Sequence, residues 1–243
     1  MSLVPLAQAC FLINSRFVGE ESYSKGASRD YLIDESPTWC VDPLDGTVNY
    51  IHLFPMFCVS IAFMHKNMPL VGVIYAPFIN QFFSSCTGRG AFLNETQRLP
   101  LVRNPIAPMP ENAPAGCVFS CEWGKDRRDI PDGNMHRKIE SFVNMAAELG
   151  SRSGRGGMVH GVRSLGSATL DLAYVAMGSF DIWWEGGCWE WYMQLIKFLR
   201  SLTDRGQGRR GRHCDFARSR RTHDNCKPAS RRSYMLNTGC QIG

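Results

Sequence analysis

One segment constrains the fold more than any other, namely Asp42–Thr47, which reads DPLDGT. It follows Thr38–Val41, a run of residues that favour strands. Pro43 has no backbone N–H to donate to a neighbouring strand, so we expect pairing to stop there. Gly46 and the residues after it can then open a short helix. The sequence therefore predicts a strand, a sharp turn and a helix in immediate succession.

The same segment carries two carboxylates three residues apart, on Asp42 and Asp45. A turn at a strand end can direct both of them, with the Leu44 carbonyl between them, towards one point, and Mg²⁺ prefers oxygen ligands of this kind. The amides that begin the next helix, on Gly46 and Thr47, suit a phosphate group. A metal site beside a phosphate cradle is what hydrolysis of a phosphoester requires. The alternative is a plain turn, because Asp, Pro and Gly favour turns for local reasons.

The rest of the chain divides into a region of strands and a region of mixed elements. Short runs of strand-forming residues separated by turns predict an antiparallel meander over residues 57–93. Helices are expected over Met135–Leu149, with its apolar residues on one face, and over Ser167–Met177, which a hydroxyl residue begins and Gly178 ends. Further strands are expected at residues 118–121 and 180–184. This succession predicts a layered α/β or α+β body.

Charge is distributed unevenly along the chain. Residues 193–243 contain 12 Lys and Arg against 3 Asp and Glu, whereas residues 1–192 contain 15 against 19. From residue 204 onward apolar residues are sparse and no helical or strand periodicity survives, so we expect residues 193–243 to be a basic, disordered tail. Such a tail could bind a nucleic-acid backbone. It has little aromatic interleaving for base stacking, so nucleic acid is not an expected partner.

The cysteines indicate the compartment. The chain has 10 of them, none in a CxxC pair, and several lie in apolar runs, where a reduced cysteine behaves as a small hydrophobe. This pattern predicts a reducing, cytoplasmic environment. No stretch approaches the length of a membrane span, so no membrane association is expected.

Three blocks in a fixed order carry a resemblance to a known family. They are GEES at residues 19–22, WCVDPLDGTVNYIHLFP with VSIAF at residues 39–63, and GSATLDLAYVAMG with WWEGGCWEW at residues 166–191. Together they resemble the inositol monophosphatase family, whose members are Mg²⁺-dependent and lithium-sensitive. DPxDGT is shared with relatives such as bisphosphate nucleotidases, whereas the other blocks are similar to the monophosphatase branch. The resemblance implies an α+β fold, a layered α-β-α-β-α sandwich of the sugar phosphatase type, over residues 1–192.

The resemblance also implies the metal site and the catalytic residues. Mg²⁺ would be bound by Glu20, Asp42, Asp45 and the Leu44 carbonyl. The catalytic residues would be Glu20, Asp45 and Thr47, with Glu20 and Thr47 orienting and deprotonating a metal-bound water. A second Mg²⁺ would stabilise the leaving alkoxide.

The substrate implied is an inositol phosphate, and the family is usually a homodimer. The residues that would contact the substrate are Gly46, Thr47, Ser167, Ala168 and Glu185. Among them Glu185 would accept hydrogen bonds from inositol hydroxyls. Asp171 stays open between a structural hydrogen-bonding role and a functional one, and Trp183 and Trp184 are expected to serve packing.

The chain departs from the family pattern in two places. The family has a metal-binding aspartate directly after the second tryptophan of its last block, whereas here Trp191 is followed by Tyr192. A neutral phenol is a poor Mg²⁺ ligand, so the second metal is expected to bind weakly. The composition changes abruptly there, and we interpret the change as a frame shift or a read into an intron, with a divergent tail as the alternative. The segment before GEES is also short for the helices that the family has there, so the domain is expected to be truncated at the N-terminus and aberrant after about residue 192.

Three functional hypotheses follow. The first is a Mg²⁺-dependent phosphatase for myo-inositol monophosphates. The second, which Tyr192 favours, is an impaired or inactive copy that binds metal or phosphate. The third is a nucleic-acid-binding protein that uses the Arg-rich tail. Under the first hypothesis another sugar phosphate is an alternative substrate, because the residues around Glu185 favour a polyol without defining the sugar.

Overall fold

A computed structural model describes residues 15–19, 34–101, 112–124, 126–131 and 133–186, with the backbone of 233–237. The described residues divide into two compact units, the first ending at Leu99 and the second beginning at Pro100. Each unit has its own sheet.

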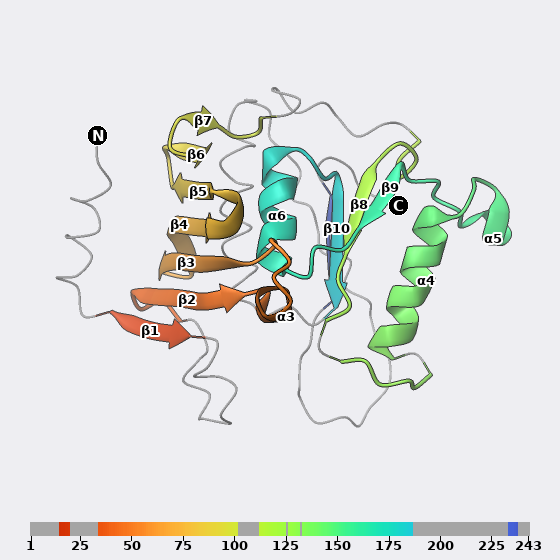
Figure 1. The fold of residues 1–243 in the computed structure, drawn as a ribbon, viewed down its shortest axis with the longest axis horizontal. Coiled ribbons are helices and arrows are strands. Elements are labelled where there is room, and N and C mark those ends of the chain that lie inside the picture. Colours follow the sequence, from red (N-terminus) through yellow and green to blue (C-terminus); the bar gives the residue numbers. More distant parts are fainter. Residues whose placement is uncertain are drawn as a thin grey trace. The chain divides into compact units, whose positions relative to one another are not determined.

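The first unit is a seven-stranded sheet whose strands lie side by side in chain order (Figure 1). The strands are β1 (Arg16–Gly19), β2 (Thr38–Asp45), β3 (Cys58–His65), β4 (Met68–Ala76), β5 (Gln81–Cys86), β6 (Gly90–Leu93) and β7 (Gln97–Arg98). The pairs from β2 to β7 are all antiparallel. The predicted meander is therefore confirmed. β1 differs, because it pairs with β2 in parallel.

β2 runs further than its proline suggests. Asp42 pairs with Ser60 of β3 and Asp45 pairs with Cys58, with a register shift between the two pairs. Pro43 lies within this register shift, where the regular hydrogen bonding between the strands is already interrupted, so its missing N–H removes no inter-strand hydrogen bond. The strand thus ends after Asp45 and not at Pro43, and the proline is accommodated by a bulge.

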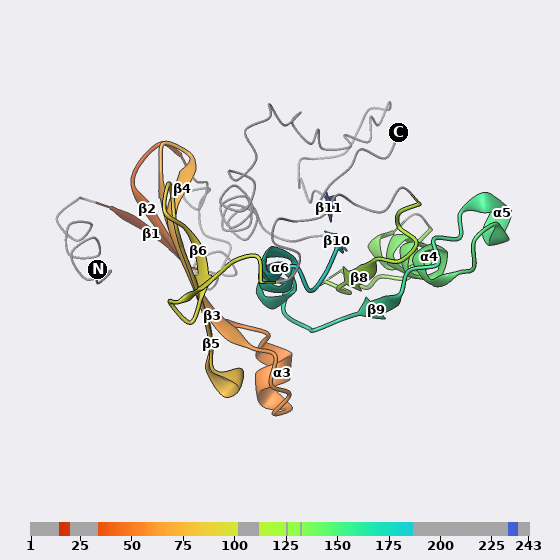
Figure 2. The same ribbon diagram turned by 90° about the horizontal axis from the view of Figure 1, so that it is seen from above.

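A short helix follows β2, as the sequence predicts. Helix α3 (Thr47–Ile51) starts after Gly46, whose φ of 84° lies in the left-handed region. The 3₁₀ turn η2 (Pro77–Ile79) connects β4 to β5. Because β2 and β4 both run antiparallel to β3, α3 and η2 project from the same end of this sheet (Figure 2).

The second unit is a four-stranded sheet in the order β11-β10-β8-β9. Its elements are β8 (Val118–Cys121), α4 (Asn134–Ala146), the single turn α5 (Ser151–Gly154), β9 (Gly161–Arg163), α6 (Ala168–Met177), β10 (Ile182–Gly186) and β11 (Ser233–Asn237). β8, β9 and β10 are mutually parallel, and β11 pairs antiparallel with β10. The carboxyl ends of the three parallel strands therefore meet at one edge of the sheet.

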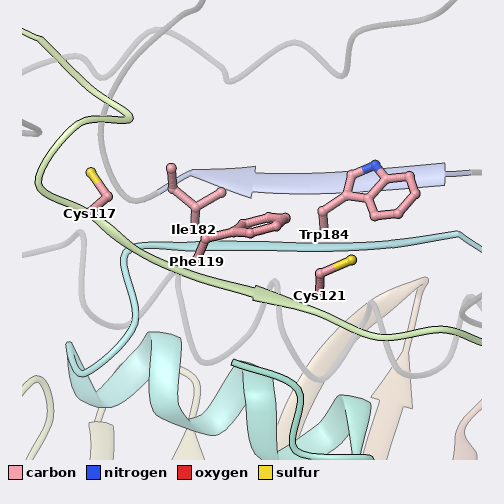
Figure 3. Packing of buried hydrophobic residues seen from close by; sticks show 5 residues of the cluster. All are labelled: Cys117, Phe119, Cys121, Ile182 and Trp184. Atoms are coloured by element: carbon pink, nitrogen blue, oxygen red, sulfur yellow. The ribbon is translucent and has the colours of Figure 1, made fainter. Parts of the chain in front are cut away.

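The two faces of this sheet differ in chemistry. A cluster of buried apolar side chains from β8, the residue before it and β10 projects to the face opposite α6 (Figure 3): Cys117, Phe119, Cys121, Ile182 and Trp184. Met145 of α4 packs against this cluster. Because successive side chains of a strand alternate between faces, Ser120, Trp183 and Glu185 belong to the face that α6 covers. Trp183 and Trp184 are both buried, as expected for packing residues.

The helix expected over Met135–Leu149 exists but buries a different face. The apolar residues Ile139, Phe142 and Val143 are exposed, and the one buried residue of α4 is Lys138. The Lys138 Nζ lies 5.5 Å from the centre of the Trp184 ring. A cation above an aromatic face is stabilised by the ring quadrupole, and the aliphatic stem of lysine fills apolar space.

Helix α6 has the ends that its sequence predicts. The Ser167 hydroxyl accepts a hydrogen bond from the Leu170 amide, which is the standard bond of an N-cap serine. Gly178 ends the helix with a left-handed φ of 88°. The helix is buried along most of its length, so its capped start is held rigidly on the sheet.

The tail is described only at β11, whose backbone forms a strand. Residues 193–232 and 238–243 lie outside the described part, so their disorder stays a prediction. None of the described helices has the length and apolar composition that a membrane crossing requires.

Two glycines test the turn after β2. A Cβ added to Gly46 would lie 2.7 Å from the Met56 carbonyl oxygen, whereas one added to Gly88 meets nothing within 4 Å, and both residues have φ above 80°. We expect Gly46→Ala to lower the free energy of unfolding by about 2–3 kcal/mol and the control Gly88→Ala by about 1 kcal/mol. Urea denaturation measures both values. Equal losses would show that the close approach to Met56 carries no cost.

Candidate functional site

The first unit carries the acidic turn that the sequence singled out, residues 42–47. Asp42 is buried near the end of β2, and its Oδ1 accepts a hydrogen bond from the Leu44 amide at 3.0 Å. This bond closes the chain into a tight turn, so that Asp42, the Leu44 carbonyl and Asp45 lie on consecutive bends of one bulged strand end. Asp45 is half-buried. The plain-turn interpretation and the metal-site interpretation are thus both compatible with the local hydrogen bonding.

Thr47 is tied to the same turn. Its exposed hydroxyl donates a hydrogen bond to the Leu44 carbonyl at 3.1 Å. The hydroxyl proton is thereby directed towards Leu44, and the oxygen lone pairs remain to accept a hydrogen bond from another group. The Leu44 carbonyl retains its second lone pair, since a carbonyl oxygen can accept twice.

The donor set fits a hard cation in its chemistry. Two carboxylates and one backbone carbonyl are all oxygen ligands, which Mg²⁺ prefers to nitrogen or sulfur. Among the described residues, no group of three or more His, Cys, Asp or Glu side chains could hold a metal. Glu20, the third expected carboxylate, lies outside the described residues, as do Trp191 and Tyr192.

The second unit carries the residues expected to contact the substrate. Ser167 is buried as the N-cap of α6, and Ala168 is the first residue of that helix. Glu185 is buried near the carboxyl end of β10. In open sheets with parallel strands, ligands bind beside the carboxyl ends of the strands. The location of these three residues within the second unit agrees with such a role.

The structure adds a carboxylate that sequence reasoning missed. Glu122 follows β8 directly and is only 8% exposed. Its Oε1 accepts a hydrogen bond from the Gly166 amide at 2.8 Å, and its Oε2 accepts one from the Ser164 hydroxyl at 3.1 Å. The available signal was its position, since an acidic residue that directly ends a buried strand often faces the edge where parallel strands end.

Asp171 lies next to this group. It is fully buried in the first turn of α6, and its Oδ1 accepts a hydrogen bond from the Ser120 hydroxyl at 2.6 Å. The pKa of Asp171 is raised to about 9, first by burial and then by the negative charge of Glu122, while the bond from Ser120 opposes the shift. Glu185 adds a smaller rise to the same pKa. Asp171 is therefore a neutral carboxylic acid at neutral pH.

The buried thiols take no part in such chemistry. Burial raises the pKa of both Cys40 and Cys121 to about 12. A thiol must ionise to act as a nucleophile, so both residues stay inert and serve packing. Cys40, Cys58, Cys117 and Cys121 are all buried and form no disulfide within the described residues, as expected for small apolar side chains.

Comparison with known sequences gives one family. Residues 10–193 match the sequence model described as the inositol monophosphatase family. The chain is 75% identical over 177 residues to protein qutG of Emericella nidulans and 72% identical over 178 residues to quinic acid degradation cluster protein x of Neurospora crassa. It is 38% identical over 176 residues to inositol monophosphatase 2 of Saccharomyces cerevisiae. Each match covers 72% of this chain and 52–55% of the relative, so the chain spans about half the length of the curated relatives it matches.

Solved structures agree on the fold. An inositol monophosphatase from Anabaena superposes with a TM-score of 0.59 at 30% identity, covering 78% of this chain and 63% of that protein. The extragenic suppressor protein suhB from Bartonella henselae superposes with a TM-score of 0.58 at 28% identity, covering 83% and 66%. These likenesses, together with the antiparallel sheet of the first unit and the helices and parallel strands of the second, confirm the predicted α+β fold class.

The neutral state of Asp171 has a consequence for stability. Between the ordinary aspartate pKa of 3.8 and about 9, the folded chain holds a proton that the unfolded chain has lost. The contribution of Asp171 to the free energy of unfolding is therefore largest at low pH. It decreases as pH rises, by at most about 1.4 kcal/mol per pH unit. In Asp171→Asn the amide replaces the neutral acid without titrating. We expect the decrease in wild-type stability between about pH 5 and pH 8 to be shallower in this variant.

The measurement is urea denaturation at a series of pH values. The exposed Glu148→Gln serves as the control and should keep the wild-type slope. Identical slopes in wild type and Asp171→Asn would mean that Asp171 is ionised in the folded chain.

Proposed function

The chain belongs to the inositol monophosphatase family, and on that premise we propose that it hydrolyses inositol monophosphate to inositol and phosphate with the help of Mg²⁺. The observation that carries the proposal is the bulged end of β2, where two carboxylates and a carbonyl occur within four residues in front of a helix start. A phosphomonoesterase needs oxygen ligands for a hard cation and backbone amides for a phosphate in one place.

Each residue of this turn then has a role. Asp42, Asp45 and the Leu44 carbonyl would bind Mg²⁺, together with Glu20. Bound Mg²⁺ supplies positive charge that neutralises the phosphate and makes a water more acidic.

The neighbouring groups would act on water and phosphate. The Thr47 hydroxyl, whose proton is directed to Leu44, would accept a hydrogen bond from the attacking water and orient it. Glu20 would take the proton of that water. The amides of Gly46 and Thr47 would hold phosphate oxygens, since the first amides of a helix have no partner within it.

The second unit would hold the alcohol part of the substrate. Glu185, at the carboxyl end of β10, would accept hydrogen bonds from ring hydroxyls. Ser167 and Ala168 would form the rim beside it, at the capped start of α6. The homodimer that the family suggests stays a prediction.

A related substrate is the second candidate. One relative at 72% identity is named a quinic acid degradation cluster protein. Quinic acid, like inositol, is a ring of six carbons with several hydroxyls, but it also carries a carboxylate. A carboxylate beside Glu185 would be repelled unless a cation lies between them. Phosphate release from inositol 1-phosphate and from a phosphorylated quinate, compared side by side, distinguishes the two substrates.

The metal site gives the first test. We expect Asp42→Asn to weaken Mg²⁺ binding and to lower kcat/KM for inositol monophosphate at least about 100-fold, because a cation contributes several kcal/mol to a phosphoryl transfer. Calorimetry measures binding and a phosphate-release assay measures turnover. The exposed Asp129→Asn is the matched control and should keep both values. Unchanged Mg²⁺ affinity in Asp42→Asn would exclude this turn as the cation site.

Tyr192 gives the second test, which concerns the impaired-copy alternative. A carboxylate binds Mg²⁺ far better than a neutral phenol. We therefore expect Tyr192→Asp to raise Mg²⁺ affinity about tenfold or more, with Tyr192→Asn as a control that adds polarity without charge. If wild type releases no phosphate and Tyr192→Asp gains neither affinity nor turnover, the loss is not a single missing ligand.

A further inference from the structure

Two buried carboxyl groups interact near the start of α6. Glu122 follows β8, and Asp171 lies one turn into the helix. Both are at least 92% buried, with exposures of 8% and 0%. Two ionised carboxylates this close in a buried site would repel each other strongly, so one of them must carry a proton.

The hydrogen bonds indicate which of the two carries it. Glu122 accepts from two donors, the Gly166 amide and the Ser164 hydroxyl, and donors of this kind favour a charged carboxylate. Asp171 accepts one bond, from Ser120, on its Oδ1. Its buried Oδ2 faces no donor among the described residues. A proton on that oxygen turns it into a donor, and Glu122 is the acceptor that lies beside it, in agreement with the raised pKa of Asp171.

The surrounding charges leave this assignment in place. Glu185 on β10 adds negative charge and favours the proton on Asp171. Lys138 of α4 lies beside Trp184, whose side chain is on the opposite face of the sheet. Arg163 of β9 is exposed, and its Nη1 donates to the Val162 carbonyl. On α6 itself, Asp171 is the only charged residue.

The pair anchors a turn that is itself partly exposed. Ser164 and Gly166 are exposed, yet each donates a hydrogen bond to the buried Glu122. Gly166 has a left-handed φ of 75° and directly precedes the N-cap Ser167. The two hydrogen bonds to Glu122 therefore help to set the backbone path into Ser167 and Ala168.

We propose that Asp171 and Glu122 share one proton, and that this pair is a positioning device which holds the turn over residues 164–166 and so fixes Ser167 and Ala168 at the substrate rim. The consequence for substrate rests on the proposed function, whereas the pair itself does not. Asp171 donates to Glu122, Glu122 keeps its charge and holds the turn, and the turn places the helix start.

Amide hydrogen exchange on the full chain tests the pair without any need for activity. In Glu122→Gln the charge that holds the turn is gone, and we expect exchange at the Gly166 amide to speed up about tenfold or more. In Asp171→Asn the amide supplies the same donor, so exchange should stay within about threefold of wild type at pH 7. Above about pH 9, exchange corrected for its intrinsic rate should rise in wild type and not in Asp171→Asn.

Three outcomes of this experiment are decisive. Fast exchange in Glu122→Gln alone supports the pair. Unchanged exchange in Glu122→Gln overturns it, because the turn would then be held by other contacts. Equally faster exchange of the Gly166 amide in both variants overturns the shared proton, because the asparagine side chain should have replaced that proton as the donor to Glu122. Asp171→Asn is also the control for general unfolding. It changes the same buried site by one isosteric group, so normal exchange in this variant shows that the site tolerates a substitution.

Kinetics test the link to substrate. With inositol monophosphate we expect Glu122→Gln to raise KM about tenfold with a change in kcat of less than about threefold, because the turn positions the rim and not the reacting atoms. Asp171→Asn should keep both constants near wild type. A loosened turn with an unchanged KM would overturn the positioning role. If wild type releases no phosphate, the proposed function fails, and the exchange experiment still decides the pair.

Discussion

A missing hydrogen-bond donor shapes the first unit. Pro43 has no N–H, and β2 accommodates it by a register shift between Asp42 and Asp45 against β3. The shift turns the chain so that the Leu44 amide reaches back to Asp42 and the Leu44 carbonyl accepts from Thr47. Two acidic residues, a carbonyl and a helix start are thereby brought together by one local irregularity. A regular strand would have sent Asp42 and Asp45 to opposite faces, since side chains three apart alternate.

The second unit depends on a different constraint, which is the cost of burying carboxyl groups. Glu122, Asp171 and Glu185 are all buried on the α6 side of one sheet. Neutralising Asp171 removes one of these charges, and two donors from the turn after β9 satisfy Glu122. These hydrogen bonds offset the free-energy cost of burying the Glu122 carboxylate, and they also order the backbone that leads into α6. Stability and the geometry of the start of α6 therefore have a common origin in this part of the chain.

Family membership and local structure support each other at different levels. The family match and the structural likenesses establish ancestry and fold class. This chain covers about half of the length of the matched relatives. The proposed residue roles rest on the family resemblance, and the local hydrogen bonding within each unit is compatible with them.

The sequence by itself determined the features that depend on near neighbours. Ser167 and Gly178 predicted both ends of α6, because capping bonds join residues three or four apart. Alternation and turns predicted the meander, and the proline turn predicted the candidate metal site. Fold class followed from the order of these elements and from the resemblance.

Only the tertiary structure decided the features that join distant residues. Ser120 and Asp171 are 51 positions apart, and Glu122 and Gly166 are 44 apart. No periodicity in the sequence connects such pairs, so neither the neutral state of Asp171 nor the role of Glu122 was visible in it. The burial of Lys138 in place of the apolar face of α4 has the same reason. Which side of a helix is buried depends on what packs against it, here the ring of Trp184 on another element.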